Sequence, residues 1–313
     1  MVASTTHEPL LNDQIRPGLY SAHYLGDVAT YLATAVVEFS LIGAAVMFIL
    51  WKSIDNGTIS CGNDAGSERV KRKHRMRVDC SSSSTGLFAG ILFLIVTFIS
   101  IGVHSVFTQL NNSRSAQLAF GLADLALFAT SLSACTIGIY RMRMLQFLRR
   151  SHGSAEILDE ILLMIGLIGE LLFCCTGMLL WITKSDENDD EAGEVYVLIV
   201  YVVRLLQVLI QTVFMLVAGR LRAHSLEAKE QKPGKQIVTF LLMANVTLFF
   251  FYTFESVNAS YCHKNVFGTQ YIIAHTVAPL IVLYRFHSSV CLAEIWKHCY
   301  SVKTASDRAQ SNY

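Results

Sequence analysis

Polar side chains recur inside long apolar stretches of this sequence, and one stretch repeats them at helical spacing. Arg204, Gln207 and Gln211 are separated by three and four residues, which places them on one face of a helix. Amide and guanidinium groups buried in this way line a path for protons or ions, or hold helices together by hydrogen bonds. We interpret this face as a candidate transport path, with structural contact between helices as the alternative.

Ionisable side chains occupy most of the other apolar stretches as well. Insertion into hydrocarbon costs roughly 2.5–3.5 kcal/mol for each charged group, and carboxylates or imidazoles kept there are typical of proton relays or sensors. The candidates are Glu38, His104, Asp124, Glu170, Arg204, Glu255, His275 and Arg285. Asp124 and Glu170 are also suited to purely structural ion pairs with the intramembrane arginines. Glu255 and Arg285 are close enough to the ends of their stretches to reach the membrane interface.

Composition explains which elements must position these residues. The chain has 313 residues, of which 53% are hydrophobic and only 16% charged, and its mean hydropathy is +0.44. Soluble domains carry about 25% charged residues, so this chain is not an ordinary soluble protein. Seven stretches reach the roughly 20 residues that a helix needs to cross a bilayer, at about 28–51, 86–108, 116–140, 157–183, 195–219, 237–256 and 268–290. Helices satisfy their own backbone groups in lipid, so we predict an all-α, polytopic membrane protein.

Basic residues indicate the orientation of these helices. Lys and Arg cluster in the loops after the first, third and fifth stretches, for example Lys71-Arg72-Lys73-His74-Arg75. The positive-inside rule places these loops and the C-terminus in the cytoplasm and the N-terminus outside. Two Asn-x-Ser/Thr triplets, at Asn111 and Asn258, then fall on the outer face, where glycosylation occurs.

Several function classes fit the sequence poorly. It contains neither a Gly-x-Ser-x-Gly elbow nor a His-Glu-x-x-His motif, and its cysteines lack zinc-binding spacing. We therefore expect no enzyme activity, no cofactor, no metal site and no nucleic-acid partner. A seven-helix receptor is a distant alternative, because the third stretch ends in Ile139-Tyr140-Arg141-Met142 and the seventh has no Asn-Pro-x-x-Tyr motif. An ion channel or transporter in the lipid bilayer fits best.

The end of the seventh stretch carries a more specific pattern. It contains Tyr284-Arg285-Phe286-His287-Ser288, followed by Trp296-Lys297. This segment resembles the last helix of the otopetrin family. Glu38-Phe39-Ser40 with Trp51-Lys52, Gly86-Leu87-Phe88-Ala89-Gly90, and Thr253-Phe254-Glu255 are similar to other otopetrin segments. The resemblance runs from about residue 28 to 300.

This resemblance implies a proton-selective channel of the plasma membrane that responds to extracellular acid. Otopetrins have twelve helices in two six-helix halves and assemble as dimers, so the implied partners are protons, lipid and a second copy or a full-length relative. The stretches here resemble helices six to twelve. The resemblance places Asn245 and Tyr284 on the proton pathway, with Gln207 or Gln211 as the glutamine that accompanies them. Phe39 replaces the usual tyrosine of the helix-six motif.

The same resemblance suggests how the chain is organised. We expect an extracellular arm at 1–27, a first transmembrane helix at 28–51, a basic cytoplasmic loop at 52–85, a six-helix domain at 86–297 and a cytoplasmic tail at 298–313. Because most of the N-terminal half is missing from this pattern, we also expect a truncated form or a fragment. The alternative function is a non-conducting subunit that modulates full-length channels.

Overall fold

The computed structural model is almost entirely helical, as the sequence predicts. It describes residues 83–110, 113–143, 145–147, 154–185, 195–222, 231–262 and 268–299, with scattered helical positions between residues 32 and 51. The long helices are α2 (Ser84–Gln109), α3 (Ser113–Met142), α4 (Ser154–Ser185), α5 (Val195–Ala218), α7 (Lys235–Cys262) and α8 (Gly268–Cys299). Within the described ranges, six helices are long and apolar enough to cross a bilayer.

These helices correspond to the second through seventh predicted stretches. Some continue further than the apolar pattern: α7 ends at Cys262 and α8 at Cys299, beyond the predicted ends at 256 and 290. A helix can extend past the hydrocarbon once its backbone is hydrogen-bonded, whereas the hydropathy pattern marks only the part in lipid. Of the first predicted stretch, residues 39–44 and 46–48 are described and are helical.

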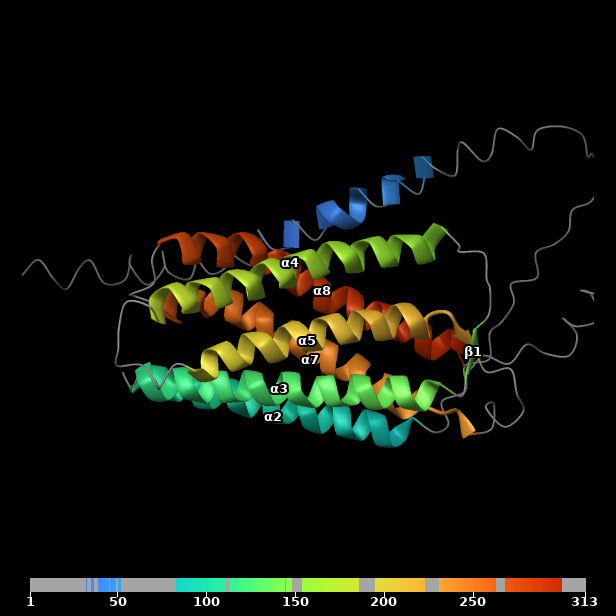
Figure 1. Ribbon diagram of the computed structural model, residues 1–313, viewed down its shortest axis with the longest axis horizontal. Coiled ribbons are helices and arrows are strands. Elements are labelled where there is room, and N and C mark those ends of the chain that lie inside the picture. Colours follow the sequence, from blue (N-terminus) through green and yellow to red (C-terminus); the bar gives the residue numbers. More distant parts are fainter. Residues whose placement is uncertain are drawn as a thin grey trace, which may run out of the picture.

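The six helices close into a ring. They run side by side along the long axis of the molecule, and each contacts two neighbours in the order α2, α3, α5, α4, α8, α7 and back to α2 (Figure 1). Additional contacts join α3 with α7 and α5 with α8 across the ring. Side chains on the inner faces of five helices, α3, α4, α5, α7 and α8, therefore converge.

Glycine permits the close contact between α2 and α7. A Cβ atom at Gly86 would lie 2.0 Å from the backbone oxygen of Gln236, and one at Gly90 would lie 2.4 Å from the Cβ of Met243. The two glycines are four residues apart and so lie on the same face of α2. Small residues at this spacing let transmembrane helices approach closely, where packing rather than water provides the attraction.

Apolar side chains cover the outside of the ring, and polar ones are buried inside it. Phe88 and Ile99 on α2 are 70% and 61% exposed, although they are strongly hydrophobic. In contrast, Glu170 and Arg285 have 0% exposure. This inversion of a soluble protein's pattern is expected where the surface faces lipid and the polar groups face one another.

Two short strands add a feature that the sequence did not predict. β1 (Gln146–Phe147) follows α3, and β2 (Leu221–Arg222) follows α5; they pair antiparallel, with Gln146 opposite Arg222. The thiol of Cys299, the last residue of α8, donates hydrogen bonds of 3.2 Å to the carbonyl oxygens of Ala218 and Leu221. The ends of α3, α5 and α8 are thus joined at one end of the bundle.

Candidate functional site

Glu170 on α4 lies at the centre of a buried ionic cluster. Its Oε2 accepts a 2.9 Å hydrogen bond from Nε of Arg204 on α5 and lies 2.9 Å from Nη2 of the same guanidinium, as an ion pair. Its Oε1 lies 2.8 Å from Nη2 of Arg285 on α8. All three side chains are almost completely buried. Charged groups are retained inside an apolar bundle only when each is paired, and here one carboxylate serves two guanidinium groups.

Aromatic rings and a second carboxylate surround the arginines. The guanidinium of Arg204 lies 4.4 Å from the ring centres of both Phe173 and Tyr252, in cation–π contact. The hydroxyl of Tyr252 donates a 3.1 Å hydrogen bond to Asp124 on α3. Asp124 is therefore the second carboxylate of the cluster, linked to the arginines through a tyrosine rather than by direct contact.

A chain of amides continues from the ionic cluster. Arg285 donates from Nη1 to Oε1 of Gln207 at 3.1 Å, and Gln207 donates to Oε1 of Gln211 at 2.7 Å. Gln211 then donates to Oδ1 of Asn245 at 2.8 Å, and Nδ2 of Asn245 donates back to Gln211 at 3.2 Å and to the carbonyl oxygen of Leu241 at 2.8 Å. These bonds connect α5, α7 and α8 in one hydrogen-bonded series, and the ion pair between Glu170 and Arg285 adds α4. We call the side chains of Asp124, Glu170, Arg204, Gln207, Gln211, Asn245, Tyr252 and Arg285 the central network.

Tyr284 forms a separate branch beside the network. Its hydroxyl donates to the carbonyl oxygen of Val208 at 3.0 Å and lies 2.9 Å from the hydroxyl of Thr212. Its partners are therefore on α5, although the resemblance to otopetrins grouped Tyr284 with Asn245. The Tyr284 side chain is fully buried, directly before Arg285 on α8.

Two clusters of buried apolar side chains pack around the network. One buried cluster includes Leu241 and Val238 on α7, and another includes Leu248 and Phe251 on the same helix. Asn245 lies between them in the sequence. The low-dielectric surroundings strengthen each polar contact and make an unpaired polar atom costly.

The predicted site residues have different places in this arrangement. Gln207, Gln211, Asn245, Asp124, Glu170, Arg204 and Arg285 belong to the central network. The burial of Arg285 shows that the alternative in which it reaches the membrane interface was wrong; its fixed partners Glu170 and Gln207 hold it inside the ring. The apolar pattern alone could not exclude that alternative, because it placed the end of the stretch at residue 290, only five residues after Arg285. The helix in fact continues to Cys299.

His104 lies apart from the network in its contacts. Its Nδ1 is 3.1 Å from the backbone oxygen of Ala116, and its ring packs 5.1 Å from that of Phe120. It therefore links the end of α2 to the start of α3. Glu38 and Asn111 lie outside the described residues, and Glu255, Asn258 and His275 lie at helical positions whose side chains the structure does not describe.

Two members of the site were missed in the sequence. Tyr252 bridges Asp124 and Arg204, and Thr212 contacts Tyr284. Tyr252 is seven residues after Asn245, two helical turns further along the same face of α7, and this spacing was the available signal. Thr212 had no such signal, since it directly follows Gln211 and a hydroxyl commonly bonds to its own helix.

A ring of membrane-length helices around buried carboxylates, guanidiniums and amides defines a polytopic membrane protein with a polar interior. Residues 10–286 match the family model of the otopetrins. The chain is also 32% identical over 287 residues to the proton channel OtopLc of Drosophila melanogaster, a match that covers 88% of this chain and 18% of that protein. The chain belongs to the otopetrin family, and it spans less than a fifth of the length of this relative.

Proposed function

We propose that this chain conducts protons across the plasma membrane when the extracellular side is acidic. The observation that carries the proposal is the continuous series of buried side chains from Glu170 through Arg285 and the glutamines to Asn245. A bundle that served only as an anchor would gain nothing from burying these groups at a cost of several kcal/mol each. The name of its relative, a proton channel, supports the same activity.

The hydrogen bonding of the network favours protons over metal cations. The amides of Gln207, Gln211 and Asn245 are too few and too firmly bonded to one another to replace the hydration shell of a metal ion. A proton needs no such shell, because it passes along hydrogen bonds through water and protonatable groups.

Other buried polar atoms indicate where water would join the series. Within the described residues, the hydroxyls of Ser131 and Ser288 and both ring nitrogens of His287 have no hydrogen-bond partner in the protein. Buried polar groups of this kind normally bind ordered water. Ser288 lies three residues after Arg285 on the same face of α8, so water at its hydroxyl would extend the polar series along that helix.

The proposal also includes an arrangement in the membrane. The N-terminus lies outside and the C-terminus in the cytoplasm, as the basic loops predict. Residues 86–297 form the six-helix domain and resemble the C-terminal half of an otopetrin. The chain pairs with a second copy or with a full-length family member. Its chemistry requires neither an enzymatic reaction nor a cofactor.

Electrophysiology of the chain expressed alone tests the activity. Whole-cell current is recorded while the extracellular pH is lowered, and a dye reports the cytosolic pH. We expect an inward current whose reversal potential follows the proton gradient. Asn245→Ala and Tyr284→Ala should each reduce it, whereas Gln236→Ala, an exposed amide on the same helix as Asn245, should leave it unchanged.

Three results would contradict the proposal in distinct ways. Unchanged proton flux in both Asn245→Ala and Tyr284→Ala would remove the network and its tyrosine branch from the path. A current that follows the Na⁺ or K⁺ gradient would exclude proton selectivity. Lack of current despite delivery to the cell surface, together with an altered current of a co-expressed full-length otopetrin, would favour the modulating subunit.

A further inference from the structure

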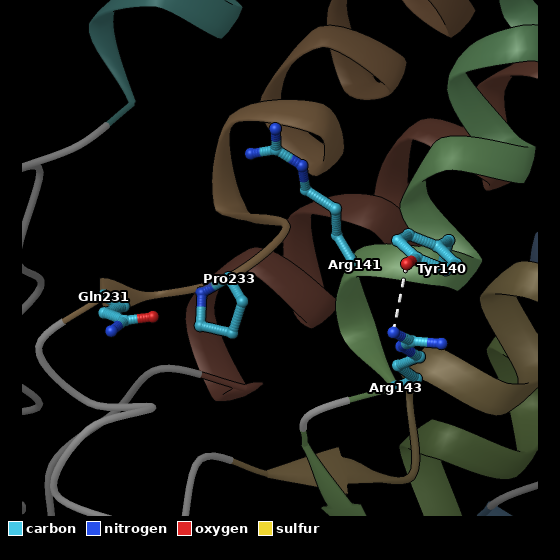
Figure 2. A pocket seen from close by; sticks show the side chains of 5 residues that line it. All are labelled: Tyr140, Arg141, Arg143, Gln231 and Pro233. Atoms are coloured by element: carbon cyan, nitrogen blue, oxygen red, sulfur yellow. Dashed lines mark hydrogen bonds between the residues drawn. The ribbon is translucent and has the colours of Figure 1, made fainter.

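A small cavity lies at the end of the bundle where α3 ends and α7 begins. Its volume is about 290 Å³, and it is lined by Tyr140, Arg141, Arg143, Gln231 and Pro233 (Figure 2). The first three residues belong to the last turn of α3 and the residue after it, and the others precede α7. The cavity is open to the outside, and it is separate in sequence from every member of the central network.

The cavity carries positive charge for which the described residues provide no carboxylate partner. Arg141 and Arg143 are both exposed, and neither has a carboxylate partner in the part of the chain that the structure describes. By comparison, Arg220, at the same end of the bundle, lies 4.0 Å from Glu160. Two guanidinium groups beside one cavity, without a carboxylate partner among the described residues, favour an anionic ligand, and their planar forks match the geometry of phosphate.

Tyr140 holds one of these arginines in place. Nη2 of Arg143 donates a 3.0 Å hydrogen bond to the Tyr140 hydroxyl, and the guanidinium carbon lies 4.0 Å from the ring centre. Figure 2 shows Arg143 turned toward Tyr140 while Arg141 extends away from it. A guanidinium fixed in advance loses less conformational freedom when it binds a ligand.

The position of the cavity identifies the source of the anion. The apolar part of α3 runs from Leu118 to Met142, so Arg141 and Arg143 lie at its end. Lipid headgroups occupy this level of a bilayer, and tyrosine is enriched there. The positive-inside rule assigns this end to the cytoplasmic leaflet, which contains the anionic lipids.

We propose that this cavity binds the phosphate group of an anionic lipid headgroup, with Arg141 and Arg143 as its ligands. Three observations support this proposal: the two arginines have no carboxylate partner among the described residues, a cavity lies between them and the start of α7, and both arginines lie at the end of the membrane span of α3. The site is independent of whether the chain conducts protons. Lipid binding there would attach the end of α3 and the start of α7 to the same leaflet.

Lipid titration tests the site directly. The full chain is purified and placed in nanodiscs of phosphatidylcholine, and fluorescent phosphatidic acid is titrated while energy transfer from the protein's tryptophans reports binding. Arg141→Gln combined with Arg143→Gln should weaken binding about 30-fold, or about fivefold for each arginine near the surface. Arg220→Gln is the matched control, because it removes an exposed arginine at the same end of the bundle, and it should change binding less than twofold.

Each outcome supports or overturns the site. Unchanged binding in the double variant would overturn it, as would an equal loss in Arg220→Gln, which would indicate only general attraction to positive charge. Displacement of the lipid by inorganic phosphate at similar concentration would show a site for free phosphate instead. If the double variant does not fold, Arg141→Gln alone, whose side chain makes no hydrogen bond or ion pair with the described residues, should still weaken binding about fivefold.

Discussion

Gly166 on α4 lies directly against the backbone of Tyr284 on α8. A Cβ atom at position 166 would come 2.7 Å from the Cα of Tyr284, closer than real side-chain atoms approach. Glu170 is one helical turn further along α4, and Arg285 follows Tyr284 on α8. The close approach of these backbones therefore sets the separation at which Glu170 and Arg285 form their 2.8 Å ion pair.

Replacing Gly166 by alanine should separate α4 from α8. We expect a loss of about 1–3 kcal/mol in the free energy of unfolding, as for other residues enlarged in a tightly packed interior. The measurement is the thermal unfolding midpoint of the purified chain in detergent. Gly102→Ala is the control, because a Cβ there would meet nothing within 4 Å. Equal unfolding midpoints for the two variants would show that the packing of α4 against α8 does not depend on this contact.

Glu170→Gln should be among the most destabilising single changes in the bundle. It removes the negative charge that pairs with both buried arginines, and breaking a buried ion pair costs about 3–5 kcal/mol. Glu160→Gln is a matched control, since its contact with Arg220 is 4.0 Å long and the two side chains are 37% and 52% exposed. Such a surface pair contributes about 0–1 kcal/mol. Chemical unfolding followed by tryptophan fluorescence measures the free energy of unfolding of both variants. If Glu170→Gln lowers this free energy no more than Glu160→Gln does, the result would argue against the ionic cluster.

Gln211→Leu should interrupt the amide series at its link to α7. Gln207 and Asn245 would each lose a hydrogen-bond partner inside the bundle, a cost of about 1–3 kcal/mol for an unsatisfied group. Proton flux, measured by a pH dye in cells, should fall while surface delivery is retained. Thr212→Val, which alters only the tyrosine branch, should reduce flux less. The reverse order would place the proton path along Tyr284 instead.

Glycosylation tests the proposed orientation without any channel measurement. If Asn111 and Asn258 face the outside, the expressed chain should carry glycans that an endoglycosidase removes, seen as a shift in electrophoretic mobility. Asn111→Gln and Asn258→Gln should each remove one glycan. A glycan at Asn56-Gly57-Thr58, in the loop assigned to the cytoplasm, together with an N-terminal epitope accessible only in permeabilised cells, would reverse the assigned topology.

The polar face of α5 could be predicted from sequence because it depends only on helical period. Arg204, Gln207 and Gln211 repeat every three or four residues, and the structure places them on one side of α5. Their partners could not be predicted in the same way. The contact between Gln211 and Asn245 requires that α5 and α7 both face the interior of the ring, and no local pattern specifies the order of helices around it.

Two other features were beyond sequence reasoning for different reasons. The hydroxyl of Tyr284 bonds to α5 because Gly166 allows α8 to approach so closely, and that approach depends on pairs of residues distant in the chain. The strands β1 and β2 have two residues each, too few for any alternation of polar and apolar side chains to appear.

The short ladder between β1 and β2 also restricts how the bundle can rearrange. It ties the chain after α3 to the chain after α5, and the Cys299 thiol fastens the end of α8 to the same place. These helices carry Asp124, Arg204 and Arg285. While the ladder and the thiol bonds remain intact, the ends of α3, α5 and α8 stay together, so we expect any separation of these three helices to be larger at their opposite ends.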